Sequence, residues 1–202
     1  NTLTLSATAA KSIVVTGNTN LDLVNTSATL VTSFDASNAT GNIEYTSANA
    51  TIGEIVTIKG GAGDDILEGN SAITVNDIIF GGAGDDIITY TGGKDTFTGG
   101  EGADKFVIGA KTAASLGTKD LYLTISDLGK GDSINVANLL NNASTVDSIA
   151  KIPVASGATF EQALNASITG AADAVKWFQF ENNTYLVVDG VNGGTEFVNG
   201  TD

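Results

Sequence analysis

The chain alternates between short apolar runs and clusters of turn-forming residues. Between residues 3 and 58, runs rich in Val, Ile, Leu and Thr recur about once per ten residues, separated by Asn, Ser, Gly and Thr. Short runs bounded in this way are typical of β-strands. The segments predicted as strands are SIVVTG, NLDLV, ATLVTSF, NIEYTS and EIVTIKG. Strands this short and this evenly spaced predict a continuous stack of β coils.

From residue 60 the pattern becomes a nine-residue repeat. The frame G-G-x-G-x-D-x-U-x, in which U is apolar, fits residues 60–68, 81–89 and 99–107. Two degenerate copies between them keep the acid and the apolar residue: GNSAITVNDIIF has a turn three residues longer, and YTGGKDTFT has its two glycines shifted. The acid therefore recurs at Asp65, Asp77, Asp86, Asp95 and Asp104.

The repeat predicts a coil with two walls. In each unit a turn of about six residues precedes a short strand whose apolar side chain points inward. A single unit cannot bury that side chain, but stacked units build a thin, continuous core. We expect Leu67, Ile88 and Phe106 on one wall and Ile79 and Phe97 on the other. The predicted fold class is all-β dominated, with a right-handed parallel β-roll or β-helix.

The same stacking would align the acidic turns. Asp65, Asp86 and Asp104 are expected in one column, and Asp77 and Asp95 in the opposite one. Carboxylates stacked at β-sheet spacing repel one another unless a cation lies between them. Ca²⁺ takes six to eight oxygens from carboxylates and backbone carbonyls. Glycines allow turn carbonyls to point inward. The repeat thus indicates calcium binding between successive turns.

Composition narrows the function classes. The formal net charge of −14 argues against nucleic acid and anionic membranes as partners. The sequence has no Cys and no His, so it lacks thiolate metal ligands, disulfides and the commonest general base. The sequence has no Met, which predicts a processed or excised piece of a longer chain. No apolar run approaches ~18 residues, so no transmembrane segment is expected. We expect no enzymatic activity.

The repeat resembles the RTX family of calcium-binding proteins. The resemblance implies at least two Ca²⁺ ions, one between residues 60–65 and 81–86 and one between residues 81–86 and 99–104. Carried over by position, the implied metal-site residues are Gly60, Gly61, Ala62, Gly63, Asp65, Gly81, Gly82, Ala83, Gly84, Asp86, Gly99, Gly100, Glu101, Gly102 and Asp104. Asp77 and Asp95 belong to the opposite edge, where the altered glycines leave a third site open.

Other segments extend the resemblance. SFDASNATGNIEYTS is similar to coils of RTX-type bacterial surface-layer proteins. FENNTYLVVDGVNGGTEFVNGTD resembles the ends of RTX proteins exported by type I secretion, and ISDLGKGDSINV resembles an element that follows the repeats. The resemblance implies an extracellular structural protein that self-associates into a surface array or joins the rest of a longer chain. The alternatives are the carrier region of a secreted enzyme or toxin, and an adhesin.

The predicted organisation has three parts: a β-coil solenoid at 1–59, the calcium-binding β-roll at 60–107, and a small β-rich region with one helix at 108–202. In the last part Thr159 is the expected helix N-cap, and a hairpin is expected to turn at Asn182-Asn183. Asp64 and Asp85 are expected to face solvent. The residues alone leave open whether Asp120, Asp127 and Asp132 serve turns, catalysis or, for the last two, a further ion.

Overall fold

The structure is a computed structural model. It describes residues 1–6, 8–25, 29–49, 51–71, 75–109, 122–136, 149–160, 162–163, 166, 174–181 and 183–189. The chain divides into two compact units, Asn1–Asn135 and Val136–Asp202. The calcium-type repeats all lie in the first unit.

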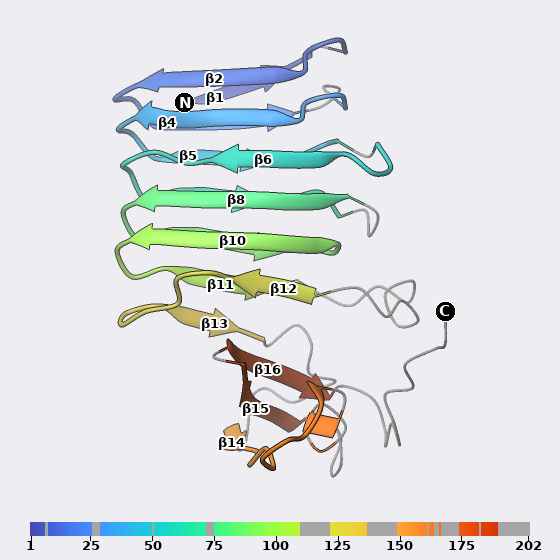
Figure 1. The fold of residues 1–202 in the computed structure, drawn as a ribbon. Coiled ribbons are helices and arrows are strands. Elements are labelled where there is room, and N and C mark those ends of the chain that lie inside the picture. The colour runs from blue at the N-terminus through green and yellow to red at the C-terminus, as the bar shows by residue number, and fades with distance from the viewer. Residues whose placement is uncertain are drawn as a thin grey trace. The chain divides into compact units, whose positions relative to one another are not determined.

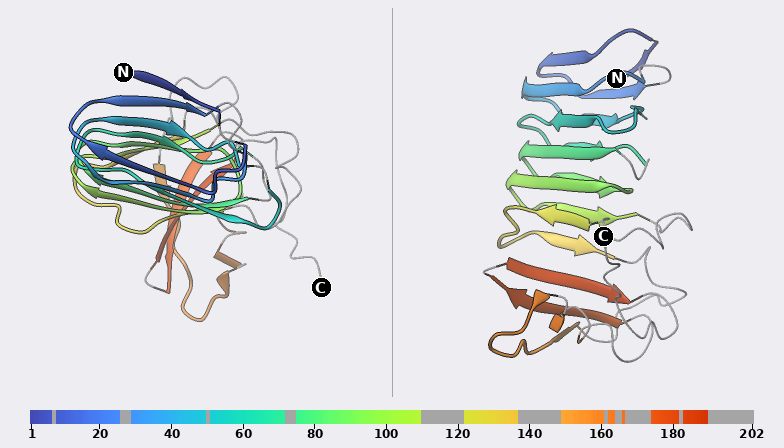
Figure 2. Two further views of the ribbon diagram at one scale, coloured as in Figure 1. Left: turned by 90° about the horizontal axis from the view of Figure 1, so that it is seen from above. Right: turned by 45° about the vertical axis from the view of Figure 1, so that its right-hand side comes forward.

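Two parallel sheets build the first unit, and consecutive strands alternate between them (Figure 1). Within the described residues, one sheet contains β1 (Thr2–Leu5), β3 (Leu21–Asn25), β5 (Ile43–Thr46), β7 (Ile66–Glu68), β9 (Ile87–Tyr90), β11 (Lys105–Ile108) and β13 (Ser133–Asn135). The other contains β2 (Ser12–Gly17), β4 (Ser33–Ala39), β6 (Ile55–Lys59), β8 (Asn76–Ala83), β10 (Lys94–Glu101) and β12 (Tyr122–Ile125). Seen along the stack, the coils superpose as flattened loops (Figure 2). The predicted parallel β-roll is confirmed.

The core lies between the two sheets and follows the repeat. Leu67, Ile88 and Phe106 pair in register on one wall, and Ile79 pairs with Phe97 on the other. All five side chains are fully buried, as predicted. In the coils nearer the N-terminus, the buried rings of Phe34 and Tyr45 stack with their centroids 3.9 Å apart.

The solenoid extends further than the repeats. β12 pairs with β10 and β13 pairs with β11, so the stack continues to Asn135, whereas a new region was predicted from residue 108. The reason is that Ile125 and Ile134 continue the inward apolar positions of Phe97 and Phe106.

One strand near the N-terminus is displaced from its prediction. β4 runs over Ser33–Ala39 rather than over ATLVTSF, because its pairing with β6 begins at Ser33. Val31 is buried outside the strand, where its carbonyl accepts a 2.9 Å hydrogen bond from Asn49 Nδ2.

The second unit contains a three-stranded sheet within the described residues: β14 (Ile149–Lys151), β15 (Ala174–Phe180) and β16 (Asn183–Asp189). β15 and β16 form the predicted hairpin, but the turn comes one residue early because Phe180 pairs with Asn183. Thr159 caps a helical start at Phe160: Gln162 N–H donates to Thr159 Oγ1, and Thr159 N–H donates to Gln162 Oε1. Gln162, Ala163 and Ala166 are also helical; the rest of the predicted helix and the tail from residue 190 lie outside the described residues.

Candidate metal centre

Three glycine-rich turns stack at one edge of the solenoid. We call them turn 1 (Gly60–Asp65), turn 2 (Gly81–Asp86) and turn 3 (Gly99–Asp104). Turn 1 connects β6 to β7, whereas turns 2 and 3 begin within the last three residues of β8 and β10 and lead into β9 and β11. Because the strands that follow them are paired in register, the last residue of each turn lies above that of the next.

The final acids of these turns form a ladder of hydrogen bonds. The Asp65 N–H donates to Asp86 Oδ1 at 2.8 Å, and the Asp86 N–H donates to Asp104 Oδ1 at 3.0 Å. Asp65 Oδ1 in turn accepts from the Ile43 N–H of the preceding coil at 2.7 Å. All three acids are at most 1% exposed, so the column that the repeat predicted is also a buried one.

Glycine is required where adjacent turns touch. Gly82 and Gly84 of turn 2 have φ of +125° and +113°, which L-residues with side chains rarely adopt. A Cβ on Gly82 would collide with the carbonyl oxygen of Gly61 in turn 1. The Ala83 N–H reaches the same carbonyl at 2.9 Å. The glycines therefore let carbonyl oxygens of one turn lie against the backbone of the next.

Oxygen atoms meet in the gaps between these turns. The space that a Cβ on Gly60 would fill is taken by Asp65 Oδ2 and the Gly81 carbonyl oxygen. At Gly81 the corresponding space holds Asp86 Oδ2 and the Gly99 carbonyl oxygen. Each gap thus brings together a carboxylate oxygen of one turn and a carbonyl oxygen of the following turn, which carries a partial negative charge.

Some of these oxygens have no donor. Within the described residues, Asp86 Oδ2 and Asp104 Oδ2 are buried without a hydrogen-bond partner, whereas Asp65 Oδ2 accepts from the Gly61 N–H at 2.6 Å. A buried, unpaired carboxylate oxygen is costly unless a proton or a cation neutralises it. Burial raises the pKa of Asp86 to about 8, and the charges of Asp65 and Asp104 contribute to the increase.

The opposite edge carries a shorter column of the same kind. The Asp77 N–H donates to Asp95 Oδ1 at 2.8 Å. Asp77 Oδ1 and Asp95 Oδ2 are buried and lack a partner within the described residues. Burial raises the pKa of Asp77 to about 6 and that of Asp95 to about 8. The sequence left open whether this edge binds an ion. The structure shows that it also contains buried carboxylate oxygens without hydrogen-bond donors among the described residues.

These residues fit a hard cation that accepts mixed oxygen ligands. Within the described part of the chain, no three acidic side chains converge on one point. A cation in the gaps would therefore depend on carbonyl oxygens as much as on carboxylates, which is the ligand preference of Ca²⁺. Mg²⁺ demands a stricter octahedral shell and usually retains several waters, so it suits these gaps less well.

A second ladder of side chains had not been predicted. Asp64 and Asp85 face solvent as expected, yet Asp64 Oδ1 accepts from the Asp85 N–H at 2.9 Å and Asp85 Oδ1 from the Ala103 N–H at 2.8 Å. Asn20 and Asn42 form the same bond in the N-terminal coils. The motif leaves this position unspecified. Only the recurrence of Asn or Asp three residues before the inward side chains of Leu23, Tyr45, Leu67 and Ile88 could have indicated the ladder.

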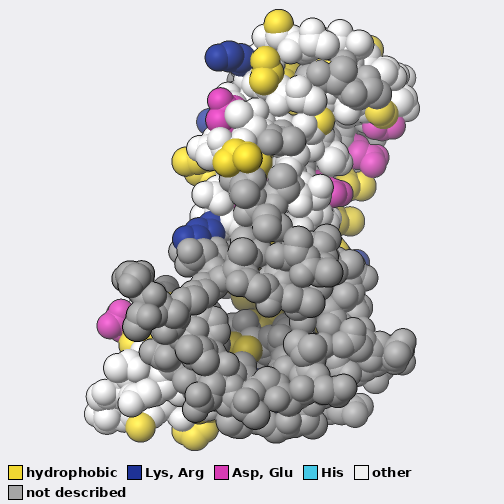
Figure 3. Space-filling view, turned by 90° about the vertical axis from the view of Figure 1, so that its right-hand side faces the viewer, with side chains coloured by type: hydrophobic (Ala, Val, Ile, Leu, Met, Phe, Trp, Pro, Cys, Tyr) yellow, Lys and Arg dark blue, Asp and Glu magenta, His cyan; other side chains and the backbone are white. Residues whose placement is uncertain are grey.

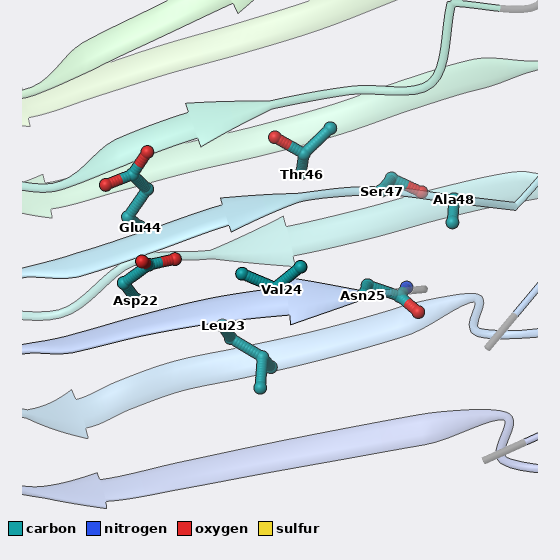
Figure 4. A pocket seen from close by; sticks show the side chains of 8 residues that line it. All are labelled: Asp22, Leu23, Val24, Asn25, Glu44, Thr46, Ser47 and Ala48. Carbon is teal, nitrogen blue, oxygen red and sulfur yellow. The ribbon is translucent and has the colours of Figure 1, made fainter. Parts of the chain in front are cut away.

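A further hollow lies on the outer face of the sheet that contains β3 and β5. Figure 4 shows Asp22 and Glu44 side by side on neighbouring strands β3 and β5, with Val24 and Thr46 beyond them. Both carboxylates are outside the core, unlike those of the turns. Closely spaced acids therefore occur outside the turns as well. The acids of the turns differ because they are buried and have carboxylate oxygens without hydrogen-bond donors among the described residues.

The fold and these turns define a parallel β-roll with cation-binding turns. A profile of the RTX calcium-binding nonapeptide repeat, four copies long, matches residues 56–72 and 76–97. No curated protein matched the sequence. The chain therefore contains RTX calcium-binding nonapeptide repeats, and turn 3, just beyond the matched residues, stacks in the same way.

Proposed function

We propose that this chain is a calcium-dependent structural segment of an extracellular bacterial surface-layer protein. The observation that supports it best is the meeting of carboxylate and carbonyl oxygens in the buried gaps, at Gly60 and at Gly81. On this proposal Asp65, Asp86 and Asp104, with turn carbonyls, hold at least two Ca²⁺ ions. When bound, each ion neutralises the negative charge of these buried oxygens.

The stability of the folded turns would then depend on calcium concentration. Without a cation, the repulsion between buried carboxylates and the entropy lost by the glycine-rich turns oppose a thin core. A ligand that binds only the folded state stabilises it by RT ln(1 + [L]/Kd), about 2.7 kcal/mol per site at a hundredfold excess over Kd. Calcium sites in extracellular modules typically have Kd values of ~10⁻⁴–10⁻³ M. Folding would therefore follow exposure to extracellular calcium.

A structural role is favoured by the form of the first unit. The segment that is similar to surface-layer coils, residues 33–47, forms β4, the following turn and β5 within the same stack as the RTX coils. On the face in Figure 3, the described hydrophobic side chains are scattered among polar ones. This distribution favours polar or ion-bridged contacts between copies. No helix among the described residues is long and apolar enough to span a membrane.

Two measurements test the proposal. Far-UV circular dichroism of the full chain should show less β-structure in EGTA than in millimolar Ca²⁺; identical spectra would refute calcium-dependent folding. Electron microscopy with calcium should show sheets or ordered oligomers that disappear in EGTA. A folded, soluble monomer with calcium would instead favour the carrier region, and specific attachment to a cell-surface ligand would favour an adhesin.

A further inference from the structure

The loop between β12 and β13 has the length of an RTX turn. Asp127–Asp132, with the sequence DLGKGD, spans six residues, as does turn 3, and we call it turn 4. In the nonapeptide frame it keeps the acid at the sixth position and an apolar residue, Ile134, at the eighth. It has lost the glycines at the first, second and fourth positions. The RTX profile ends at residue 97 and does not include it.

Turn 4 nevertheless stacks on turn 3 as the repeats stack on one another. The Asp104 N–H donates to Asp132 Oδ1 at 3.0 Å, which continues the ladder of acids. The Ser133 N–H donates to the Asp104 carbonyl at 2.8 Å, as the Lys105 N–H does to the Asp86 carbonyl. The side chains of Thr98 and Ser126, just before the two turns, are joined at 2.7 Å. Turn 4 is thus a fourth member of the column.

The carboxylates of Asp104 and Asp127 both lie beside Gly99, where turns 3 and 4 face each other. Asp104 Oδ2 lies against Gly99, buried and without a donor among the described residues. The Asp127 carboxylate reaches the same glycine, accepting from the N–H groups of Gly99 and Gly100, both at 2.9 Å. Burial raises the pKa of Asp104, and the charges of Asp132, Asp127 and Asp85 raise it further.

Asp127 occupies the position at which turns 2 and 3 contribute a backbone carbonyl to the neighbouring gap. It is the first residue of turn 4, as Gly81 and Gly99 are the first residues of turns 2 and 3. Gly81 brings its carbonyl oxygen to Asp65 Oδ2 of turn 1, and Gly99 brings its carbonyl oxygen to Asp86 Oδ2 of turn 2, which has no donor among the described residues. Asp127 places a charged carboxylate below turn 3, so the negative charge that needs a counter-ion is larger here than in the glycine gaps.

We propose that turns 3 and 4 form an additional calcium-binding site, to which Asp104 and Asp127 contribute carboxylate oxygens. This site rests on the proposed function and extends the column of ions one gap beyond the recognisable repeats. Because Asp127 is exposed, whereas Asp65, Asp86 and Asp104 are buried, the ion in this gap binds more weakly than the others. An acid side chain replaces ligands that turn 4 lost with its glycines.

Counting ions in the full chain tests the site. Isothermal titration calorimetry and native mass spectrometry with Ca²⁺ should give one ion more for the wild-type protein than for Asp127→Asn or Asp127→Gly. The lost ion should be the weakest one. Asp22→Asn is the matched control, because it removes the same charge from the outer face of β3 and should leave the count unchanged.

The outcomes separate this inference from the proposed function. Asp127 variants that bind as many ions as the wild type, with the same affinities, would overturn the turn 3–turn 4 site while leaving the RTX sites intact. A wild-type protein that binds no calcium would overturn both. Asp127→Gly decides the matter if Asp127→Asn shows no β spectrum in calcium, since glycine occupies this position in turns 2 and 3.

Discussion

The N-terminal coils and the RTX coils share one solenoid but fill the same buried column differently. In the N-terminal coils the inward position at the start of the strand holds Leu21 and then Ile43. In the next coil this register position is Asp65, followed by Asp86 and Asp104. Ile43 and Asp86 are each 1% exposed. The column changes from apolar side chains to carboxylates without a change in backbone stacking.

The opposite edge repeats this change. Asp77 pairs in register with Val56 of the preceding coil, and Asp95 pairs with Leu123 of a later one. Val56 and both acids are buried. Two acids are therefore inserted between apolar neighbours in a column that is otherwise hydrophobic.

The comparison shows where a cation is needed. Apolar residues in these columns are stabilised by their own burial, whereas acids in the same place leave oxygens without partners. Calcium dependence should accordingly be strong in the coils from Gly60 onward and weak in those before it. The stacked pair Phe34 and Tyr45 adds to the cation-independent stability of the N-terminal coils.

The largest effect is expected when an acid is placed in the apolar part of the column. Ile43→Asp should destabilise the solenoid by about 3–5 kcal/mol in calcium, because it buries a charge where no site compensates it. Urea unfolding measures the loss. Ile66→Asp, on the exposed outer face of the next coil, is the matched control and should cost far less. Equal losses of stability in the two variants would mean that burial of the carboxylate in the column does not cause the destabilisation.

Replacing a glycine in the gaps between turns should destabilise the solenoid nearly as much as Ile43→Asp does. Gly82→Ala places a methyl group against the Gly61 carbonyl oxygen at φ +125°, whereas Gly17→Ala has a similar φ of +115° with nothing within 4 Å. The Gly17 variant should lose about 1–2 kcal/mol from backbone strain alone. The Gly82 variant should lose roughly 2 kcal/mol more. Thermal unfolding in calcium compares them, and indistinguishable losses would contradict the close approach of turns 1 and 2.

Asp86→Asn should have effects of opposite sign with and without calcium. The amide retains an acceptor for the Asp65 N–H and offers a donor near the Gly99 carbonyl, so it removes the unpaired charge. In EGTA the variant should be more stable than the wild type by about 1–3 kcal/mol. In calcium it should be less stable, with a higher calcium requirement for folding. A variant that is less stable than the wild type in EGTA as well would contradict this account of the column.

Lowering the pH should also have opposite effects on the fold without calcium and on calcium binding. The pKa values of about 8 for Asp86 and Asp95 and about 6 for Asp77 are all raised in the folded state. The cation-free fold therefore binds more protons than the unfolded chain, and its stability should increase as pH falls from about 8 toward 4. With calcium present, protons compete for the same oxygens, so the calcium midpoint should rise over this range. Circular dichroism follows both, and a cation-free fold insensitive to pH would count against the buried charge.

The sequence was sufficient for the parts of the fold that repeat. Regular spacing fixed which residues share a wall, so the stacking of Leu67, Ile88 and Phe106 and the alignment of Asp65 with Asp86 followed from the nonapeptide. It was insufficient where spacing breaks. Twenty-eight residues separate Asp104 from Asp132, since 132 − 104 = 28, so turn 4 shows no period even though its bonds match those of the repeats. The relation between Ile43 and Asp65 appears only when strand pairing is known.

The most direct test is a crystal structure of the full chain grown in millimolar Ca²⁺, with anomalous scattering used to locate the ions. The account predicts an ion between turns 2 and 3 within about 2.3–2.6 Å of Asp86 and of a turn carbonyl oxygen, and another between turns 1 and 2. Turns stacked as described here, with Asp86 buried and no ion near it at saturating calcium, would contradict the claim that a cation balances these oxygens.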